Sequence, residues 1–448
     1  MQAIKFINHA SVLISDDSSA LLTDPWYEGS ILNDGWNLLY KNREEDIIEV
    51  LKNTSHIWIS HEHPDHFSVI FFNKYRDLIN AKKIKILFQK TKDRRVFNFL
   101  KTKGFDIEEV KDGLSYKIND NFIIQIERFG FYDSALIITI DNKKIINLND
   151  CIIEDKKVLD KFAKKYGPAD LLLTQFSYAA WKGGKDNNTW RLKAASEKID
   201  RINEQAESLA CKNIIPFASF SYFSNKENFY MNEGANSPIE VKDKLESRKD
   251  NNFNVIIMRP LESHNLNKLF QNEESLNFWK DIYNNINNLP KTEYKKIDFD
   301  ELQSNSEKYQ RNIFSKNSKT FMYFLSLIPV LNIFQSLNIY LYDMDTVVEF
   351  SIFKGIKKSE QKNYHVEMHS NSLNFIFNNE FGYDTLTANG NFETDRIGFS
   401  KLTKSLSIGS LNTLGYKFSL SLLFNPSIYL FFLYMLTKVS KNLENPYD

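Results

Sequence analysis

Hydrophobic and polar residues alternate along the first 260 residues in short runs, which predict strands interleaved with helices. The apolar runs at 5–14, 56–60 and 122–129 are bounded by polar turns, as strands are. Longer amphipathic stretches at 67–79 and 189–210 predict helices between the strands. Because the two kinds of element intermix, the pattern favours an α/β fold of the αββα sandwich type and argues against a helical bundle.

A different pattern begins after residue 262. Residues 263–319 are rich in Asn, Lys and Glu and predict a polar helical linker region. Residues 320–448 combine predicted strands with a short amphipathic helix at 371–381, which is typical of an α+β domain. We therefore predict a first domain at 1–262, the linker region, and a C-terminal α+β accessory domain.

Composition restricts the partners and the compartment. The 448-residue chain carries 57 Lys and Arg against 57 Asp and Glu, so no basic excess indicates nucleic acid. Its two cysteines, Cys151 and Cys211, cannot form a disulfide framework or an iron–sulfur cluster alone. Few cysteines fit a reducing compartment, and the N-terminal segment indicates a strand rather than a signal peptide. The expected location is cytoplasmic.

Two uncharged apolar stretches raise the question of membrane contact. Residues 320–342 are interrupted by Pro329 and several amides, and residues 418–437 are broken at Asn425-Pro426. The second stretch has the length that a bilayer span requires, but the break divides it into short halves. We expect a buried helix or core segment, with association at the membrane surface as the alternative.

The strongest chemical signal is the hexapeptide His-Glu-His-Pro-Asp-His at 61–66. It follows the buried apolar strand at 57–59 directly and offers three imidazoles and one carboxylate. A loop that leaves a strand end can direct His61 and His63 to one metal ion, and Asp65 and His66 to a second position. Imidazole together with carboxylate suits zinc or iron. The sequence therefore predicts a site for one or two divalent metal ions.

This hexapeptide resembles the HxHxDH signature of the metallo-β-lactamase superfamily. The resemblance implies the αββα metallo-β-lactamase sandwich, a structural role for Asp24 in LLTDPW and a metal-bridging role for Asp150 in IINLNDC. It also implies that Asp65 orients the attacking nucleophile, so that Asp65 and Asp150 are the catalytic carboxylates. The implied metal ligands are His61, His63, Asp65, His66 and Asp150.

Four segments also resemble the metallo-β-lactamase-like part of the CMP-sialic acid hydroxylases, over about residues 5–260. They are TDPWYEGSILNDGWNLL, ISHEHPDHFS, INLNDC, and QFSYAAWKGGKDNNTW followed by IIPFASFSYF. That similarity implies iron and a sugar-nucleotide substrate. Those hydroxylases also carry a Rieske centre, which needs two Cys and two His in tight pairs. No such pairs occur in this sequence, so an oxygenase of this kind needs an external redox partner.

The sequence departs from the superfamily pattern at two ligand positions. No third histidine precedes the strand of Asp150, and Asp133 is the nearest substitute. The last histidine is also absent, and Ala218 stands about where it is expected. His264 is a distant alternative for that place. The site therefore binds one metal ion, forms an atypical diiron centre, or is completed from elsewhere in the chain.

Three residues are candidates for substrate binding. Trp26 lies beside Asp24, in a loop of the kind that flanks a metal cleft. Lys182 lies in the basic loop WKGGK, which could hold a phosphate or nucleotide group. His9 follows the first predicted strand and is expected near the rim of the site. The plainer alternatives are a solvated loop for Lys182 and a packed or surface position for His9.

The C-terminal segment 365–393 resembles the strand, helix and turn of sterol-carrier-protein-2-like domains. That resemblance implies lipid binding or dimer contact through the C-terminal domain.

Three functions stay open at this stage. The first is a metal-dependent hydrolase in which metal-activated water attacks a polar small molecule, such as a sugar nucleotide or phosphorylated compound. The second is an iron-dependent monooxygenase acting on a CMP-sialic-acid-like sugar nucleotide with an external electron donor. The third is a non-enzymatic binding protein with a decayed site.

Overall fold

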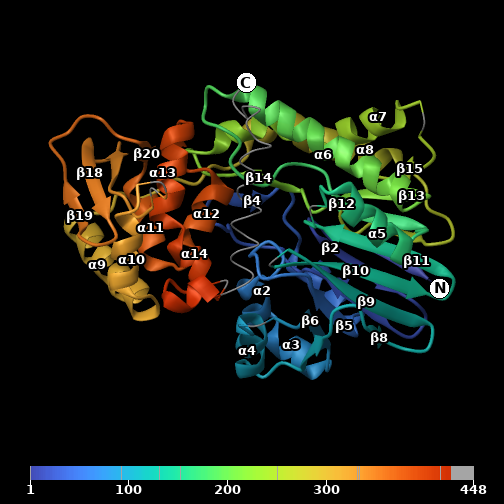
Figure 1. Cartoon of the computed structure of the whole chain (residues 1–448). Coiled ribbons are helices and arrows are strands. Elements are labelled where there is room, and N and C mark those ends of the chain that lie inside the picture. Colours follow the sequence, from blue (N-terminus) through green and yellow to red (C-terminus); the bar gives the residue numbers. More distant parts are fainter. Residues whose placement is uncertain are drawn as a thin grey trace.

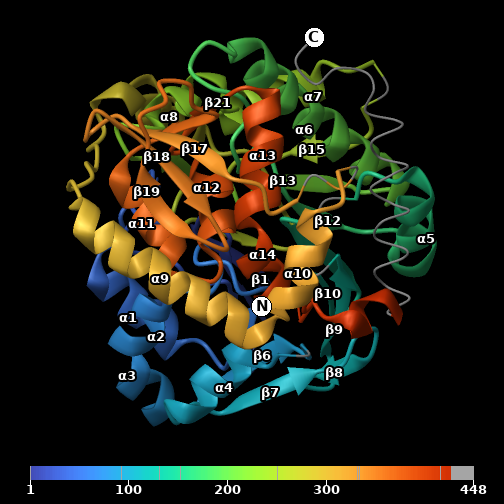
Figure 2. The ribbon, with the colours of Figure 1, turned by 60° about the vertical axis from the view of Figure 1, so that its left-hand side comes forward.

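The computed structural model describes residues 2–424, apart from positions 92, 131, 152, 250, 330, 332 and 414. Two seven-stranded sheets pack face to face, and helices cover the outer face of each sheet (Figure 1). This is the αββα sandwich that the strand and helix pattern predicts. A five-stranded sheet with its own helices forms a C-terminal unit at one end of the sandwich, and Figure 2 shows that unit turned forward.

The first sheet contains mainly N-terminal strands. Its spatial order is β16 (Ser263–Asn265), β1 (Ala3–Asn8), β2 (Ser11–Ser15), β3 (Ala20–Thr23), β5 (His56–Ile59), β6 (Lys85–Gln89) and β7 (Ile107–Val110). The last four strands of this order run parallel to one another. Their carboxyl ends therefore meet at one edge, and the hexapeptide follows β5 at that edge.

The second sheet repeats this arrangement. Its spatial order is β15 (Asn254–Val255), β13 (Asn213–Phe217), β12 (Leu171–Gln175), β11 (Lys143–Asn149), β10 (Asp133–Ile140), β9 (Phe122–Phe129) and β8 (Ser115–Lys117). Strands β11, β12 and β13 are parallel, whereas β10 runs antiparallel to β11. Consequently the first residue of β10, Asp133, lies near the end of β11, which Asp150 follows.

Helices bury both outer faces of the sandwich. The first sheet is covered by α1 (Glu44–Lys52), α2 (Val69–Lys74), α3 (Arg76–Ala81) and α4 (Arg95–Thr102), and the second by α5 (Lys156–Tyr166), α6 (Asn188–Ser208), α7 (Pro238–Glu246) and α8 (Glu273–Asn284). Strand β5 shows how its residues are buried on both faces of the sheet. Trp58 packs between the sheets, while Ile57 and Ile59 pack against helices, because side chains alternate along a strand. A strand buried on both faces is a continuous apolar run.

The core of the C-terminal unit is continuous with buried residues of the sandwich, such as Trp26, Trp181 and Met231. Its sheet order is β19 (Gly355–Lys358), β18 (Thr346–Ser351), β17 (Leu337–Leu341), β20 (Val366–Met368) and β21 (Glu393–Thr394). Its helices are α9 (Phe299–Lys316), α10 (Lys319–Ser326), α11 (Ser370–Asn378), α12 (Gly382–Asn389), α13 (Arg396–Leu406) and α14 (Ile408–Thr413). The predicted helix at 371–381 corresponds to α11.

The unit is fixed to the sandwich by specific contacts. A small sheet of β4 (Trp36–Leu38) and β14 (Ser221–Phe223) adjoins it, and the ring of Trp181 stacks on that of Phe399 at 5.2 Å. The N–H of Trp181 also donates to the carbonyl of Thr387 at 2.8 Å.

Residues 263–319 divide between the two units. Strand β16 pairs with β1, and α8 packs on the sandwich through Trp279, which is fully buried against Phe220. Helix α9 packs instead on α11 and β19 of the C-terminal unit. The region predicted as a linker thus contributes folded elements to both cores, and the chain crosses between the units after α8.

Among the described residues, no helix combines the length and the apolar character needed to cross a bilayer. Most of the apolar stretch at 418–437, from residue 425 onward, lies outside the described residues. Its predicted packing and any contact with a membrane surface stay predictions.

Candidate metal centre

The loop after β5 buries His61, Asp65 and His66 and leaves His63 exposed. The carbonyl of His63 accepts hydrogen bonds from the N–H groups of His66 (3.0 Å) and Phe67 (2.7 Å), so the chain makes one tight turn. His61, Asp65 and His66 are all buried, at 5% exposure or less. A solvated polar loop would leave these side chains in water, so the burial favours a built site.

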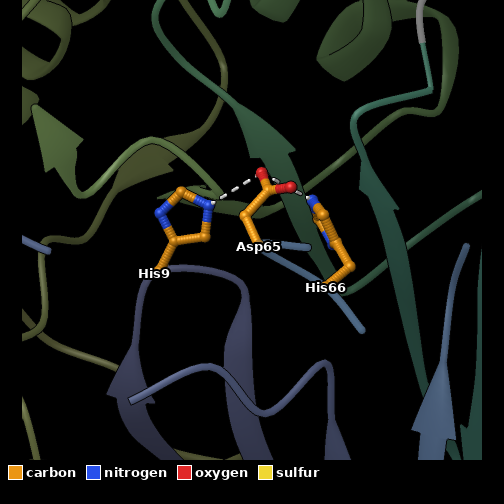
Figure 3. Close-up of side chains that lie close together, drawn as sticks. All are labelled: His9, Asp65 and His66. Carbon is orange, nitrogen blue, oxygen red and sulfur yellow. Dashed lines mark ion pairs between the residues drawn. The ribbon is translucent and has the colours of Figure 1, made fainter. Parts of the chain in front are cut away.

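Three overlapping groups of side chains bring ligand atoms within 4.8 Å of one another. The groups are His61, His63 and Asp133; His61, His66 and Asp150; and His9, Asp65 and His66. Figure 3 shows the third group, with His9 and His66 on opposite sides of the Asp65 carboxylate. The structure therefore brings together all five predicted metal ligands and adds Asp133 and His9 to them.

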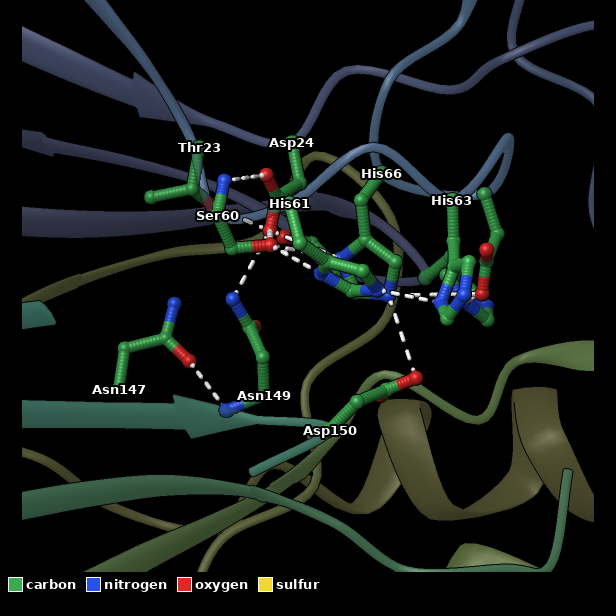
Figure 4. A network of polar contacts seen from close by, with 12 residues as sticks. Thr23, Asp24, Ser60, His61, His63, His66, Asn147, Asn149 and Asp150 are labelled. Atoms are coloured by element: carbon green, nitrogen blue, oxygen red, sulfur yellow. Dashed lines mark hydrogen bonds and ion pairs between the residues drawn. The ribbon is translucent and has the colours of Figure 1, made fainter. Parts of the chain in front are cut away.

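Asp24 and Ser60 orient the imidazoles from behind (Figure 4). One carboxylate oxygen of Asp24 accepts hydrogen bonds from His66 Nδ1 (2.9 Å), Ser60 Oγ (2.8 Å) and Asn149 Nδ2 (2.8 Å). Ser60 Oγ in turn lies 2.9 Å from His61 Nδ1. With their Nδ1 atoms engaged, His61 and His66 keep Nε2 for the centre, as metal-ligating histidines commonly do.

Asp133 and Asp150 approach the histidines from the second sheet. Asp133 Oδ1 lies 3.8 Å from His61 Nε2, and Asp150 Oδ2 lies 3.5 Å from His66 Nε2. Gln175, the last residue of β12, donates to Asp150 Oδ1 at 2.8 Å, and Lys198 on α6 donates to the Gln175 side-chain oxygen. Sequence reasoning missed Gln175 and Lys198. The only signal for Gln175 was its place at the end of a strand beside that of Asp150.

Electrostatics set the charge states of the ligands. Burial raises the pKa of Asp133 to about 6, with Asp150 contributing and His63 opposing. Burial and the neighbouring His66 lower the pKa of His61 well below its usual value. For Asp65, burial acts in the opposite direction, but His66 holds its pKa well below the usual range. Burial acts to lower the pKa of His66, but Asp65, Asp150 and Asp24 raise it well above its usual value. Metal binding at His66 therefore releases a proton, because a neutral imidazole and an ionised carboxylate are the forms that bind metals.

The residues present fit a divalent metal ion. Within the described part of the chain, the Nε2 atom of His66 and both ring nitrogens of His9 are buried without a hydrogen-bond partner. Each such atom costs roughly 1–3 kcal/mol when left unsatisfied. A bound cation satisfies the Nε2 atoms of His66 and His9 and offsets the surplus of carboxylates around the imidazoles. Imidazole nitrogen with carboxylate oxygen is a donor set for zinc or iron.

A cleft of about 670 Å³ opens above the centre. Its floor includes the ligand residues His63, Asp65, Asp133 and Asp150. A second side consists of Ala194, Glu197, Lys198 and Arg201, whose spacing places them on one face of α6. A third side comes from the C-terminal unit through Phe375, Phe381, Asp384, Thr385 and Ala388. Both units therefore shape the space around the metal ligands.

The three predicted substrate-binding residues occupy different places. Lys182 lines the cleft. Trp26 and His9, each 1% exposed, are not among its lining residues; their rings pack edge to face at 5.2 Å. The backbone N–H of Lys185, in the loop predicted to hold a phosphate, already donates to the Glu393 carboxylate at 3.1 Å. That carboxylate occupies the position that the prediction gives to an anionic ligand.

No protein-family model matches the chain, and no curated protein matches it. Among solved structures, a metallo hydrolase from Ignicoccus hospitalis is 18% identical over 59% of this chain and 97% of that chain, with a TM-score of 0.42. The diiron β-hydroxylase CmlA from Streptomyces venezuelae is 14% identical over 59% of this chain and 54% of that chain, also at 0.42. The metallo-β-lactamase fold protein YhfI from Bacillus subtilis is 12% identical over 59% of this chain and 98% of that chain, at 0.38.

The molecule has the αββα metallo-β-lactamase fold, which rests on its layers and its two sheet orders. Its neighbours among solved structures include metallo hydrolases and a diiron hydroxylase. The resemblances to CMP-sialic acid hydroxylases and to sterol-carrier-protein-2-like domains stay predictions.

Proposed function

We propose that the chain is a metal-dependent enzyme of hydrolase type that acts on a small molecule held in the cleft. One observation carries the proposal. The ligands predicted from sequence, His61, His63, Asp65, His66 and Asp150, converge with Asp133 beneath a single cleft. They come from three separate segments of the chain, and the burial of His61, Asp65 and His66 disfavours folding unless the charges are matched. A bound metal explains both the convergence and the burial.

A divalent metal bound here supplies a Lewis acid and a water molecule whose pKa falls towards neutrality. His61, His63 and Asp133 would hold one ion, and Asp65, His66 and Asp150 a second. With a metal bound, the ionised carboxylate of Asp65 would accept a hydrogen bond from the attacking water and orient it towards the substrate. Asp24 holds Nδ1 of His66 and Ser60 holds Nδ1 of His61, which leaves the Nε2 atom of each ring for a metal.

The walls of the cleft indicate the class of substrate. On the α6 side Lys198 and Arg201 are the basic residues, and Arg201 is paired with Glu154 at 3.1 Å. On the C-terminal side the ring of Phe381 is 49% exposed and lies near Phe375. The substrate in this proposal is an amphipathic small molecule, with a negative group near Lys198 and an apolar part against Phe381.

The charge of Lys198 gives this substrate class a pH signature. Burial, helped by the nearby Arg201, lowers the pKa of Lys198 to about 8. Its ammonium charge is therefore present below pH 8 and lost above it. For an anionic substrate, KM is expected to rise as pH passes through about 8. Lys198→Met removes this inflection, whereas Lys193→Met, on the exposed side of α6, keeps it. A wild-type KM that is flat from pH 6.5 to 9.5 contradicts the role.

Hydrolysis itself is tested on protein purified without added metal. A panel of esters, lactones and phosphodiesters is assayed under nitrogen, and one class is expected to turn over without oxygen. A chelator and the double substitution of His61→Ala with His63→Ala should each abolish that turnover. His365→Ala, in the C-terminal unit, serves as the control. Turnover that survives both treatments argues against a metal mechanism.

One observation favours a second candidate, an iron-dependent monooxygenase. Asp133 stands where a third histidine is expected, and a site of two histidines and one carboxylate is typical of non-haem Fe(II) oxygenases. Cys151 and Cys211 are both buried free cysteines, and two cysteines alone form no iron–sulfur cluster. Such an enzyme would therefore take electrons from a redox partner to act on a CMP-sialic-acid-like substrate. Iron in the purified protein, with oxygen uptake that requires a reductant, supports this candidate. Zinc with turnover under nitrogen excludes it.

A further inference from the structure

His9 occupies a strained position that the surrounding residues hold in place. It lies in the turn between β1 and β2 with a φ of 40°, in the left-handed region that only some residues adopt readily. The side chain of Asn8 secures this turn: its Oδ1 accepts the N–H of His9 at 2.9 Å, and its Nδ2 donates to Asn42 at 2.7 Å. Strain of this kind persists at functional sites because neighbouring residues enforce it.

The imidazole of His9 is buried without the contacts a structural histidine makes. It is 1% exposed, and neither ring nitrogen has a hydrogen-bond partner among the described residues. Its ring packs edge to face on Trp26 at 5.2 Å, which fixes the ring plane. In Figure 3 one ring nitrogen points at the carboxylate of Asp65. Most buried polar side-chain atoms have a partner, so two unpartnered nitrogens on one buried ring point to a ligand.

The distances match those between ligands of one ion. His9 Nε2 lies 3.5 Å from Asp65 Oδ2, and His66 Nε2 lies 3.4 Å from the same oxygen. Two ligand atoms that are each about 2.0–2.2 Å from a shared zinc ion lie roughly 3–3.5 Å apart in tetrahedral geometry. Both histidines thus lie at ligand spacing from Asp65, and the ligand atoms of all three side chains lie within 4.8 Å of one another.

We infer that His9 is a ligand of the second metal ion and replaces the histidine that the superfamily pattern expects near Ala218. The two positions adjoin, because the N–H of Ala218, just after β13, donates to the carbonyl of His9 at 3.0 Å. In this inference, His9 in the turn between β1 and β2 takes the place of the histidine expected after β13. This inference rests on the proposed metal centre. It gives His9 a role as a metal ligand, in place of the substrate-binding role predicted from sequence.

The test is the number of metal ions bound per chain, measured by elemental analysis after metal loading and gel filtration. Wild-type protein should hold two ions. His9→Phe keeps the ring volume beside Trp26 but removes both nitrogens, so it should hold one ion. The dissociation constant of the second ion should rise by at least tenfold. In a His9→Ala background, adding Ala218→His should restore part of the lost affinity.

His264→Ala is the matched control, because His264 is also buried with an unpartnered Nδ1, in β16. It should retain two ions. If His9→Phe binds the second ion as tightly as wild-type protein, the inference is overturned while the metal centre stands. The inference is also overturned, and the metal centre again stands, if wild-type protein binds a single ion and His9→Phe leaves its affinity unchanged. If wild-type protein binds no metal after loading, the proposed function itself fails.

Discussion

At the scale of single residues, Asp133 and His9 bring donor atoms to the predicted ligands from other parts of the chain. Asp133 is the first residue of β10 and reaches the first group of ligands because β10 runs antiparallel to β11. His9 reaches the second group from the turn between β1 and β2. Neither residue belongs to the hexapeptide, so the fold is needed to bring these donor atoms to the cluster.

Asp133 should weaken the fold of the metal-free protein. Its pKa of about 6 lies above the value of about 3.9 for an unfolded Asp. The folded state thus binds this proton more tightly, and stability falls as pH rises from about 4 through 6. Asp133→Asn should therefore stabilise the metal-free protein at pH 7.5 by on the order of 2–3 kcal/mol, with little effect near pH 4.

Urea unfolding of both proteins at the two pH values measures this difference. With metal present the order should reverse, because only the carboxylate of the wild-type protein completes the ligand group. Equal stability of the two metal-free proteins at pH 7.5 would show that Asp133 carries no such cost.

The sequence could place side chains near the cluster where the signal was local, and their role as ligands stays a prediction. The hexapeptide and Asp150 each follow an apolar strand directly, so position after a strand end was enough to place them near the centre. Gln175 and Lys198 act through contacts with residues far away along the chain. No short motif marks either residue, and only the register of β11 with β12 and the placement of α6 bring them together.

At the scale of elements, α8 tests whether residues 263–319 contribute to a core. Trp279 is fully buried, its ring lies 4.4 Å from that of Phe220, and its Nε1–H donates to the carbonyl of Met258 at 2.9 Å. Trp279→Ala is therefore expected to destabilise the sandwich by about 3–5 kcal/mol. Phe270→Ala, at a residue 53% exposed just before α8, is the control. A flexible linker would tolerate both substitutions equally in a thermal melt.

The segment between α11 and α12 tests the apolar wall of the cleft. Decanoate, an anion with an apolar tail, serves as the probe and is titrated into the metal-loaded protein by calorimetry. Phe381→Ala should weaken its binding by roughly threefold to tenfold, which corresponds to about 1 kcal/mol of lost apolar contact. Phe324→Ala, on the exposed face of α10 outside the cleft, should leave binding unchanged. Equal losses in both variants would place the probe elsewhere.

Elements of the sandwich were predictable because alternation of period two and runs of helical length mark them. Residues 263–319 were harder to assign, since α8 and α9 bury only narrow stripes beneath polar faces. Their overall polarity suggested a linker, although Trp279 and Tyr309 anchor them in two different cores.

At the scale of the whole molecule, the C-terminal unit closes one side of the metal cleft. Phe375, Phe381 and Thr385 join the cleft lining although they lie some 300 residues beyond the hexapeptide. Their placement depends on how the C-terminal unit packs on the sandwich, through contacts such as Trp181 with Phe399. Sequence patterns describe each core but carry no periodic signal for how two cores meet. The C-terminal side of the cleft therefore could not be predicted from the sequence.

The central claim is that this chain binds metal ions through the clustered histidines and aspartates. Elemental analysis of protein purified without added metal tests it most directly, with the double variant of His61→Ala and His63→Ala measured alongside. We expect zinc or iron at a fixed stoichiometry of one or two ions per wild-type chain, and a clear loss in the variant. A wild-type protein that holds no transition metal, even after loading, would contradict the account.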